Sequence, residues 1–166
     1  MFHYFKFVGA IGLLLGFLLW LSTQTQAKPL PYWRLPVAPP MKVLDGFAAP
    51  NPNWLPGHRG IDLEARNGSQ VVAPSAGVIT FADQLAGRGV VVIQHGSVRS
   101  TYEPVTPSLK VGEYVVAGDV IGRVDCGISH CCRGLVAKCL HWGLKQGPEY
   151  LNPLSRLDLR VVLLPD

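Results

Sequence analysis

The sequence predicts an all-β fold, an antiparallel β-sandwich or barrel-sandwich built from short strands joined by glycine and proline turns. Beyond residue 42, runs of four to seven residues are dominated by β-branched side chains. Turn residues separate these runs about every ten positions, which is typical of a sandwich or a barrel. No window in this region shows an apolar period of 3.6 over ten or more residues, so no long helix is expected.

The expected strands are short segments spread through the body of the chain. They span residues 61–65, 71–73, 77–82, 90–95, 98–102, 114–116, 120–124 and 140–145. Successive side chains of a strand point to opposite faces of its sheet. In the first segment, Asp62 and Glu64 are therefore expected on one face. In the last, Cys139, His141 and Gly143 are expected to share a face.

Residues 1–27 are organised like a signal peptide. His3 and Lys6 precede an apolar run over residues 7–21, and polar residues follow up to Ala27. Fifteen apolar residues are fewer than the roughly 20 that a bilayer-spanning helix needs. We expect cleavage after Ala27. The alternative is an uncleaved N-terminal anchor, which would associate the protein with the membrane through residues 2–21. Either organisation predicts export to the cell envelope or the extracellular space.

Residues 28–42 are rich in proline and are expected to form an extended linker. Proline lacks an amide hydrogen and has a fixed φ, so it is rare in the interior of helices and sheets. The folded domain is expected to cover residues 43–160. With a length of 166 residues, the whole chain has room for one ordinary domain.

The charge pattern argues against a nucleic-acid partner. The full chain has a net charge of +4, and Lys6 is the only charged residue within the first 27. The basic residues are scattered and form no run, so nucleic acid is not indicated. A modest positive charge suits an anionic cell wall or membrane surface. The sequence does not define an oligomeric state.

Four cysteines, Cys126, Cys131, Cys132 and Cys139, lie within 14 residues. Outside the cytosol an even number of cysteines favours disulfides. A bond between the adjacent Cys131 and Cys132 would be strained, so we expect Cys139 to pair with one of them and Cys126 with the other. A structural zinc on four cysteines is the alternative, although the spacing lacks two C-x-x-C pairs.

Two distant segments contain candidate metal ligands. His58 and Asp62 lie in Gly57–Asp62, where glycine favours a loop that leads into a strand, and His141 lies in Cys139–Gly143. Two imidazoles and one carboxylate can bind Zn²⁺ and leave a fourth position for water, as in catalytic zinc sites. The alternative is a loop histidine beside a solvated aspartate, with His141 as a half-buried structural residue.

These segments belong to a longer series of motifs. The series consists of Gly57–Asp62, Val72–Val78, Val92–Gly96, Thr101–Tyr102, Val111–Gly122, Leu140–Trp142 and Leu151–Pro153. In order and spacing it resembles the lysostaphin-type family of zinc metalloendopeptidases, which act on bacterial peptidoglycan. The resemblance covers roughly residues 45 to 155, and this variant is most similar to envelope proteins of actinobacteria.

The resemblance implies a fold, a metal and a reaction. The H-x-x-x-D motif of the family places two zinc ligands on His58 and Asp62. The second histidine of its H-x-H motif corresponds to His141. The resemblance thus implies Zn²⁺ as cofactor and an exported metalloendopeptidase that acts on peptidoglycan peptides in cell-wall remodelling, with zinc-bound water as the nucleophile.

The sequence departs from the family at both histidines that assist catalysis. Pro104 and Cys139 occupy those positions. Four other side chains are candidates to replace them, and none is assigned as the catalytic base: Tyr102, His95, Glu103 and His130. The alternative function is therefore a catalytically weak or inactive module that binds zinc or the cell wall and regulates another wall hydrolase.

A third hypothesis comes from the strand motifs alone. The segments around Gly77 and Gly112 are similar to those of biotin- and lipoate-carrier domains. Such domains need a lysine at a hairpin tip, and Lys110 is the lysine between these segments. It lacks flanking methionines, so this hypothesis ranks below the other two.

Overall fold

The computed structural model describes residues 33–125 and 139–158, which belong to one compact unit starting at Tyr32. The expected signal peptide and three of the cysteines, Cys126, Cys131 and Cys132, lie outside the described residues, as does His130. None of the helices within the described ranges is long and apolar enough to cross a membrane.

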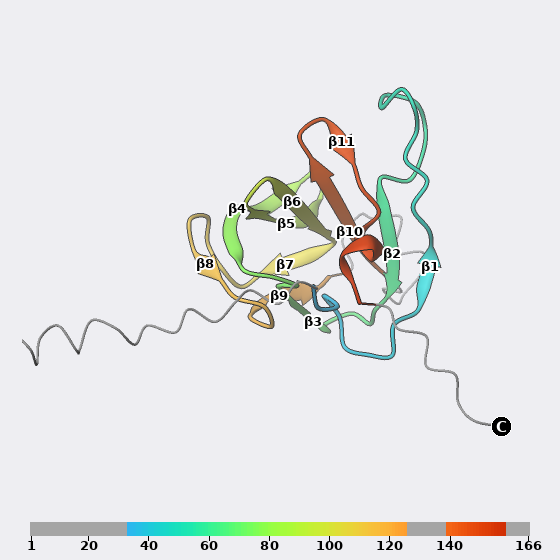
Figure 1. The fold of residues 1–166 in the computed structure, drawn as a ribbon. Helices are drawn as coiled ribbons and strands as arrows, with labels where there is room; N and C mark the ends of the chain where they lie inside the picture. The colour runs from blue at the N-terminus through green and yellow to red at the C-terminus, as the bar shows by residue number, and fades with distance from the viewer. Residues whose placement is uncertain (1–32, 126–138, 159–166) are drawn as a thin grey trace, which may run out of the picture. The chain divides into compact units, whose positions relative to one another are not determined.

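Two antiparallel sheets form the described part of the chain (Figure 1). The larger sheet has the order β1-β2-β10-β6-β5-β4-β8, with β11 paired to β10, and the smaller has the order β3-β9-β7. The strands are β1 (Val43–Asp45), β2 (Gly60–Glu64), β3 (Gln70–Val72), β4 (Gly77–Leu85), β5 (Arg88–His95), β6 (Val98–Glu103), β7 (Val105–Pro107), β8 (Tyr114–Val115), β9 (Val120–Val124), β10 (Cys139–Gln146) and β11 (Glu149–Tyr150).

The all-β prediction is confirmed. Each of the eight expected segments forms a strand, with ends that differ by at most three residues. The short strands β1, β7 and β11, of two or three residues each, were not expected. The one helix among the described residues is the single 3₁₀ turn η1 (Pro153–Arg156), which Asn152 caps by accepting a hydrogen bond from the Leu154 amide.

The two faces of β2 and β10 differ in the way that a period of two predicts. Ile61, Leu63, Leu140 and Trp142 are fully buried in the core that lies between the sheets. Burying side chains of this size contributes roughly 1.5–3 kcal/mol each. This anchoring fixes the register of β2 against β10, and the intervening side chains are therefore held on the opposite, outer face.

The proline-rich segment before β1 packs on the body instead of forming a free linker. The Trp33 amide donates to the Arg156 carbonyl at 2.8 Å, and the Val72 amide donates to the Pro36 carbonyl at 2.9 Å. Val37 is only 6% exposed and belongs to the core. The compact unit thus starts about ten residues before the expected boundary at 43, because apolar side chains in an irregular segment find a tertiary surface to cover.

A chain of hydrogen bonds crosses the buried face of β6 and β5. Burial raises the pKa of the Tyr102 hydroxyl well above its usual range, so the hydroxyl stays protonated and donates to Ser100 Oγ at 2.7 Å. Ser100 in turn lies 2.8 Å from His95 Nε2, and His95 Nδ1 lies 2.8 Å from the Ala76 carbonyl. A neutral His95 that donates from Nδ1 and accepts at Nε2 satisfies both contacts.

His95 should make stability depend on pH. Burial lowers its pKa below 6.5, and the hydrogen bond to Ala76 opposes this shift only partly. As pH falls through about 6.5, the unfolded chain binds a proton that folded His95 still refuses, so the free energy of unfolding decreases until the folded pKa is passed. Urea unfolding of the wild type and of His95→Gln between about pH 8 and 5 tests this: the stability advantage of the wild type should shrink toward low pH, at no more than about 1.4 kcal/mol per pH unit. An advantage that is constant over this range would contradict the prediction.

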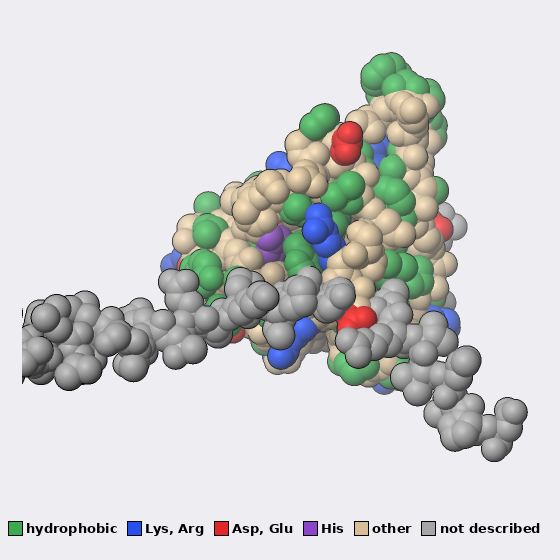
Figure 2. Space-filling model, viewed as in Figure 1, with side chains coloured by type: hydrophobic (Ala, Val, Ile, Leu, Met, Phe, Trp, Pro, Cys, Tyr) green, Lys and Arg blue, Asp and Glu red, His purple; other side chains and the backbone are tan. Residues whose placement is uncertain are grey.

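A loop of fourteen residues joins β1 to β2 and projects beside β11 (Figure 1). Hydrophobic side chains gather at its tip (Figure 2), where Trp54 is 82% exposed and Leu55 is 43% exposed. Asn53 Nδ2 donates to the Pro148 carbonyl at 3.0 Å and so ties the loop to the β10–β11 hairpin. The far end of this loop carries His58.

Candidate metal centre

His58 is held by the backbone on both of its sides. Its amide and its carbonyl each form a 2.9 Å hydrogen bond with Ala48 in an isolated bridge. Its ring nitrogen Nδ1 lies 2.6 Å from the Gly46 carbonyl and 3.5 Å from Asp45 Oδ2. A carbonyl oxygen can only accept, so Nδ1 carries the hydrogen and Nε2 is the nitrogen whose lone pair is left for a ligand.

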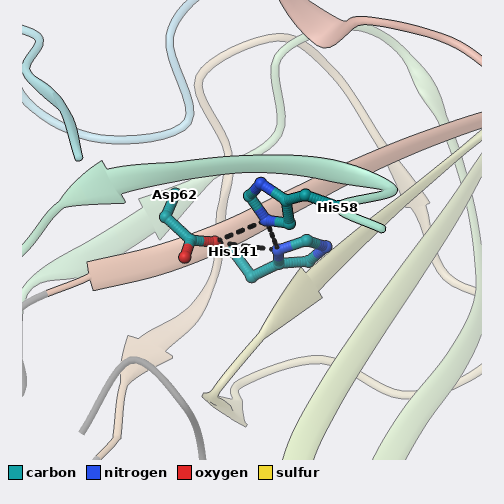
Figure 3. A group of neighbouring side chains, drawn as sticks. All are labelled: His58, Asp62 and His141. Carbon is teal, nitrogen blue, oxygen red and sulfur yellow. Dashed lines mark hydrogen bonds and ion pairs between the residues drawn. The ribbon is translucent and has the colours of Figure 1, made fainter. Parts of the chain in front are cut away.

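Asp62 and His141 face that lone pair from neighbouring strands (Figure 3). They are directly opposite each other in the register of β2 and β10. Asp62 Oδ1 lies 2.9 Å from His141 Nδ1 and 3.1 Å from His58 Nε2, and the two ring nitrogens are 3.1 Å apart. The structure thus brings together all three residues that the sequence analysis selected, with one donor atom of each within 4.8 Å of the others.

The donor set fits Zn²⁺. Two imidazole nitrogens and one carboxylate oxygen are ligands that zinc commonly has in catalytic sites. The hydrogen bond from His58 Nδ1 to Gly46 is the kind of outer contact that fixes the tautomer of a ligating histidine. Asp62 is only 5% exposed, and a buried carboxylate with an imidazole nitrogen at 2.9 Å and another at 3.1 Å is a favourable place for a cation.

Two glycines shape the space around the His141 ring. A Cβ on Gly60 would lie 2.7 Å from both Cε1 and Nε2 of His141 and 2.5 Å from the Trp142 carbonyl oxygen. The ring therefore packs directly on bare backbone. Gly143 is the cross-strand partner of Gly60, but a Cβ there would meet nothing closer than 3.6 Å. Gly60 is thus required for the position of His141, whereas Gly143 could accept a Cβ in ordinary contact with the same ring.

The candidate replacements for the missing histidines divide between the two faces of the larger sheet. Tyr102 and His95 belong to the buried network on the opposite face from His141. Glu103 is the cross-strand neighbour of His141 on β6. The two residues line one small cavity. Both carboxylate oxygens of Glu103 contact Arg88, at 2.8 and 3.3 Å. An ion pair of this kind holds the carboxylate in place.

The two positions where the family has catalytic histidines differ in their surroundings. Pro104 is buried just after the end of β6, and its side chain has no group that can carry a proton. Cys139 lies at the start of β10 and is disulfide-bonded. A disulfide sulfur does not titrate, so neither position can take part in proton transfer. The prediction of which cysteine pairs with Cys139 falls on residues outside the described ranges.

Sequence reasoning missed the contacts that support the site. The Gly46 carbonyl gives no signal in the sequence, because any residue supplies a carbonyl. The partnership of Arg88 with Glu103 joins residues 15 positions apart through strand pairing. Lys145, which lines the same cavity as His141, was also missed. It could have been predicted, since the alternation that places Cys139, His141 and Gly143 on one face continues to residue 145.

Three side chains that could hold a metal ion thus converge on one face of the larger antiparallel sheet. The family model of peptidase family M23 matches residues 56–153, and the chain belongs to this family. The lysostaphin-type resemblance is thereby confirmed. An uncharacterized protein of Mycobacterium tuberculosis is 44% identical over 127 residues, which are 74% of this chain and 50% of the relative. The chain spans about half the length of the curated relatives it matches, and their mycobacterial origin agrees with the expected actinobacterial variant.

Solved structures show the same fold at low sequence identity. A zinc-containing peptidase from Vibrio cholerae has a TM-score of 0.63 at 18% identity, covering 76% of this chain and 40% of that one. The catalytic domain of a prophage-encoded M23 protein from Enterococcus faecalis, in a mutant form, has a TM-score of 0.57 at 21% identity. That match covers 73% of this chain and 95% of the other. At these identities the likeness concerns the fold alone.

Proposed function

We propose that this protein is an exported zinc-dependent metalloendopeptidase that hydrolyses amide bonds in the peptides of peptidoglycan. The observation that carries this proposal is the convergence of His58 Nε2, Asp62 Oδ1 and His141 Nδ1. Membership of peptidase family M23 supports a peptidase-type function. The apolar run over residues 7–21 supports export.

In this reaction the residues of the protein would bind the metal ion and orient the substrate. His58, Asp62 and His141 would hold Zn²⁺, which, when bound, supplies Lewis-acid activation of water and of the scissile carbonyl. The Gly46 carbonyl keeps the lone pair of His58 turned toward the ligand site. Gly143, which has no side chain, lines a cavity together with His141, and this would let a substrate backbone approach His141.

Proton transfer is where this protein would differ from its family. A positioned acid or base is typically worth a factor of 10²–10⁴ in rate. Pro104 and the disulfide-bonded Cys139 supply none, and the Glu103 carboxylate is bound by Arg88. We therefore expect a slow peptidase whose acceleration comes from the metal and from substrate positioning.

Cleavage of purified muropeptides tests the proposal. The zinc-loaded protein lacking residues 1–27 should release new amino groups, detected by amine labelling and by mass spectrometry of the products. Asp62→Asn, which removes the anionic ligand with little change in shape, should lower the rate at least 100-fold. The matched control is Asp83→Asn, an exposed carboxylate on β4, and it should be as active as the wild type. No amine release by zinc-loaded wild type would overturn the proposal.

The second candidate is a module that binds zinc or the cell wall and regulates another wall hydrolase. It is favoured by one observation, that neither Pro104 nor Cys139 can move a proton. A protein that binds zinc tightly and binds muropeptides, yet leaves them uncut over days, would support this candidate over the enzyme.

A further inference from the structure

A small cavity continues from the metal centre along the outer face of β10. Its volume is about 180 Å³, and His141, Gly143 and Lys145 line it from that strand. Thr101 and Arg99 line it from β6, opposite Gly143 and Lys145 respectively. Gly143 has no side chain and Thr101 has a small one, so these two residues place no bulky group between the metal centre and the far end of the cavity.

The far end of this cavity is basic. Arg59, Arg99 and Lys145 all line it, and Tyr150 lies between two of them. The Tyr150 ring centroid is 4.9 Å from Lys145 Nζ and 5.5 Å from the guanidinium carbon of Arg59. The one acidic residue in the lining, Glu103, is already bound by Arg88. The positive charge at this end is therefore not neutralised by the lining itself.

The basic groups are held in place by the fold. The Arg59 guanidinium donates to the backbone carbonyls of Asn53, Leu55 and Gly57, so it is fixed against the β1–β2 loop. Arg99 and Lys145 are a directly opposed cross-strand pair, and like charges in this position repel each other. Neither has an ion-pair partner among the described residues. Bringing an anion between them would relieve this repulsion.

We propose that Arg59, Arg99 and Lys145 form a subsite for a carboxylate of the bound peptide. The proposal rests on the proposed peptidase function for the position of the scissile bond at His141. Lys145 lies four residues after His141 in β10, about 13 Å along the strand at 3.3 Å per residue. An extended peptide lying along this strand would place a carboxylate about four residues from the bond at the metal. The subsite makes this protein selective for peptides with a free carboxyl terminus or an acidic side chain there.

Calorimetric titration of the full chain with matched peptides tests the subsite without relying on catalysis. The zinc is removed by chelation so that no peptide is cut. The probes are acetyl-tetraalanine with a free carboxyl terminus, the same peptide as its terminal amide, and the amide with glutamate at the third position. We expect a carboxylate peptide to bind about tenfold more tightly than the neutral amide, which corresponds to about 1.4 kcal/mol. Whichever carboxylate peptide binds more tightly identifies the terminus or the side chain as the group recognised.

Variants separate the subsite from general attraction to a basic protein. Arg99→Gln and Lys145→Gln, singly and together, should remove the preference for the carboxylate, with folding checked by thermal unfolding. Lys110→Gln removes an exposed lysine outside the cavity and should keep the preference. Equal affinity for all three peptides, no binding of any, or an unchanged preference in the double variant would overturn the subsite. Failure of the muropeptide assay alone would leave these affinities unaffected, so the two failures can be distinguished.

Discussion

Replacing His141 with alanine is expected to lower the zinc content of the purified protein from about one ion per chain to near zero. The His141 Nδ1 atom is one of only three converging donor atoms in this cluster. A site with two remaining ligands binds zinc weakly. Changes to outer contacts of a zinc site commonly weaken binding 10–100-fold, so loss of a ligand should weaken it by more than about 100-fold. Elemental analysis after dialysis measures the stoichiometry, and a competing chelator measures the affinity.

The control for this variant is His95→Gln. His95 contacts Ser100 and the Ala76 carbonyl on the buried face, so its loss should leave one zinc per chain. Two results would contradict the proposed metal centre: wild-type protein that takes up no zinc, or His141→Ala that retains it with wild-type affinity. The first of these would favour the regulatory module over the enzyme.

Replacing Gly60 with alanine should damage the metal centre and the fold together. The new Cβ would lie 2.5 Å from the Trp142 carbonyl oxygen and 2.7 Å from the ring of His141. Trp142 is fully buried, so its backbone cannot retreat, and the imidazole must rotate away from Asp62. Overpacking of this kind typically destabilises a protein by about 1–3 kcal/mol. We expect a lower midpoint in urea unfolding and a loss of zinc in the same variant.

Gly143→Ala is the matched control, because Gly143 is paired with Gly60 across the two strands. Its Cβ would meet His141 Nε2 at 3.6 Å and Thr101 Cβ at 3.7 Å, which are ordinary contacts. This variant should keep its zinc and unfold within about 0.5–1 kcal/mol of the wild type, the loss or gain expected at an unstrained glycine in a strand. Equal stability and equal zinc content in both variants would show that Gly60 does not position His141.

The strands and the buried faces follow from the sequence because they depend on a local pattern. Alternation in residues 61–64 and 140–144 separates the fully buried Ile61, Leu63, Leu140 and Trp142 from Asp62 and His141. The pairing of these two strands is not local. It joins residues about 80 positions apart, and only the resemblance to a known family brought His141 to His58 and Asp62. The structure shows the physical cause, which is the antiparallel register that places Asp62 opposite His141.

The segments that sequence reasoning misjudged have no periodic pattern. Residues 33–42 contain prolines that exclude a helix or an inner strand, yet Trp33 and Val37 find apolar surfaces to cover. The β7 strand consists of three residues and includes Pro107, which a pattern search rejects. The basic subsite combines three elements, the loop before β2, β6 and β10, so no window along the chain contains it.

The stacking of Trp33 has a mechanical consequence. Trp33 lies 6.4 Å from Trp142, ring centroid to ring centroid, and forms a parallel bridge with Leu157. The described part of the chain therefore begins and ends at adjacent points. Tension applied through these two points would load that bridge and the indole stack first.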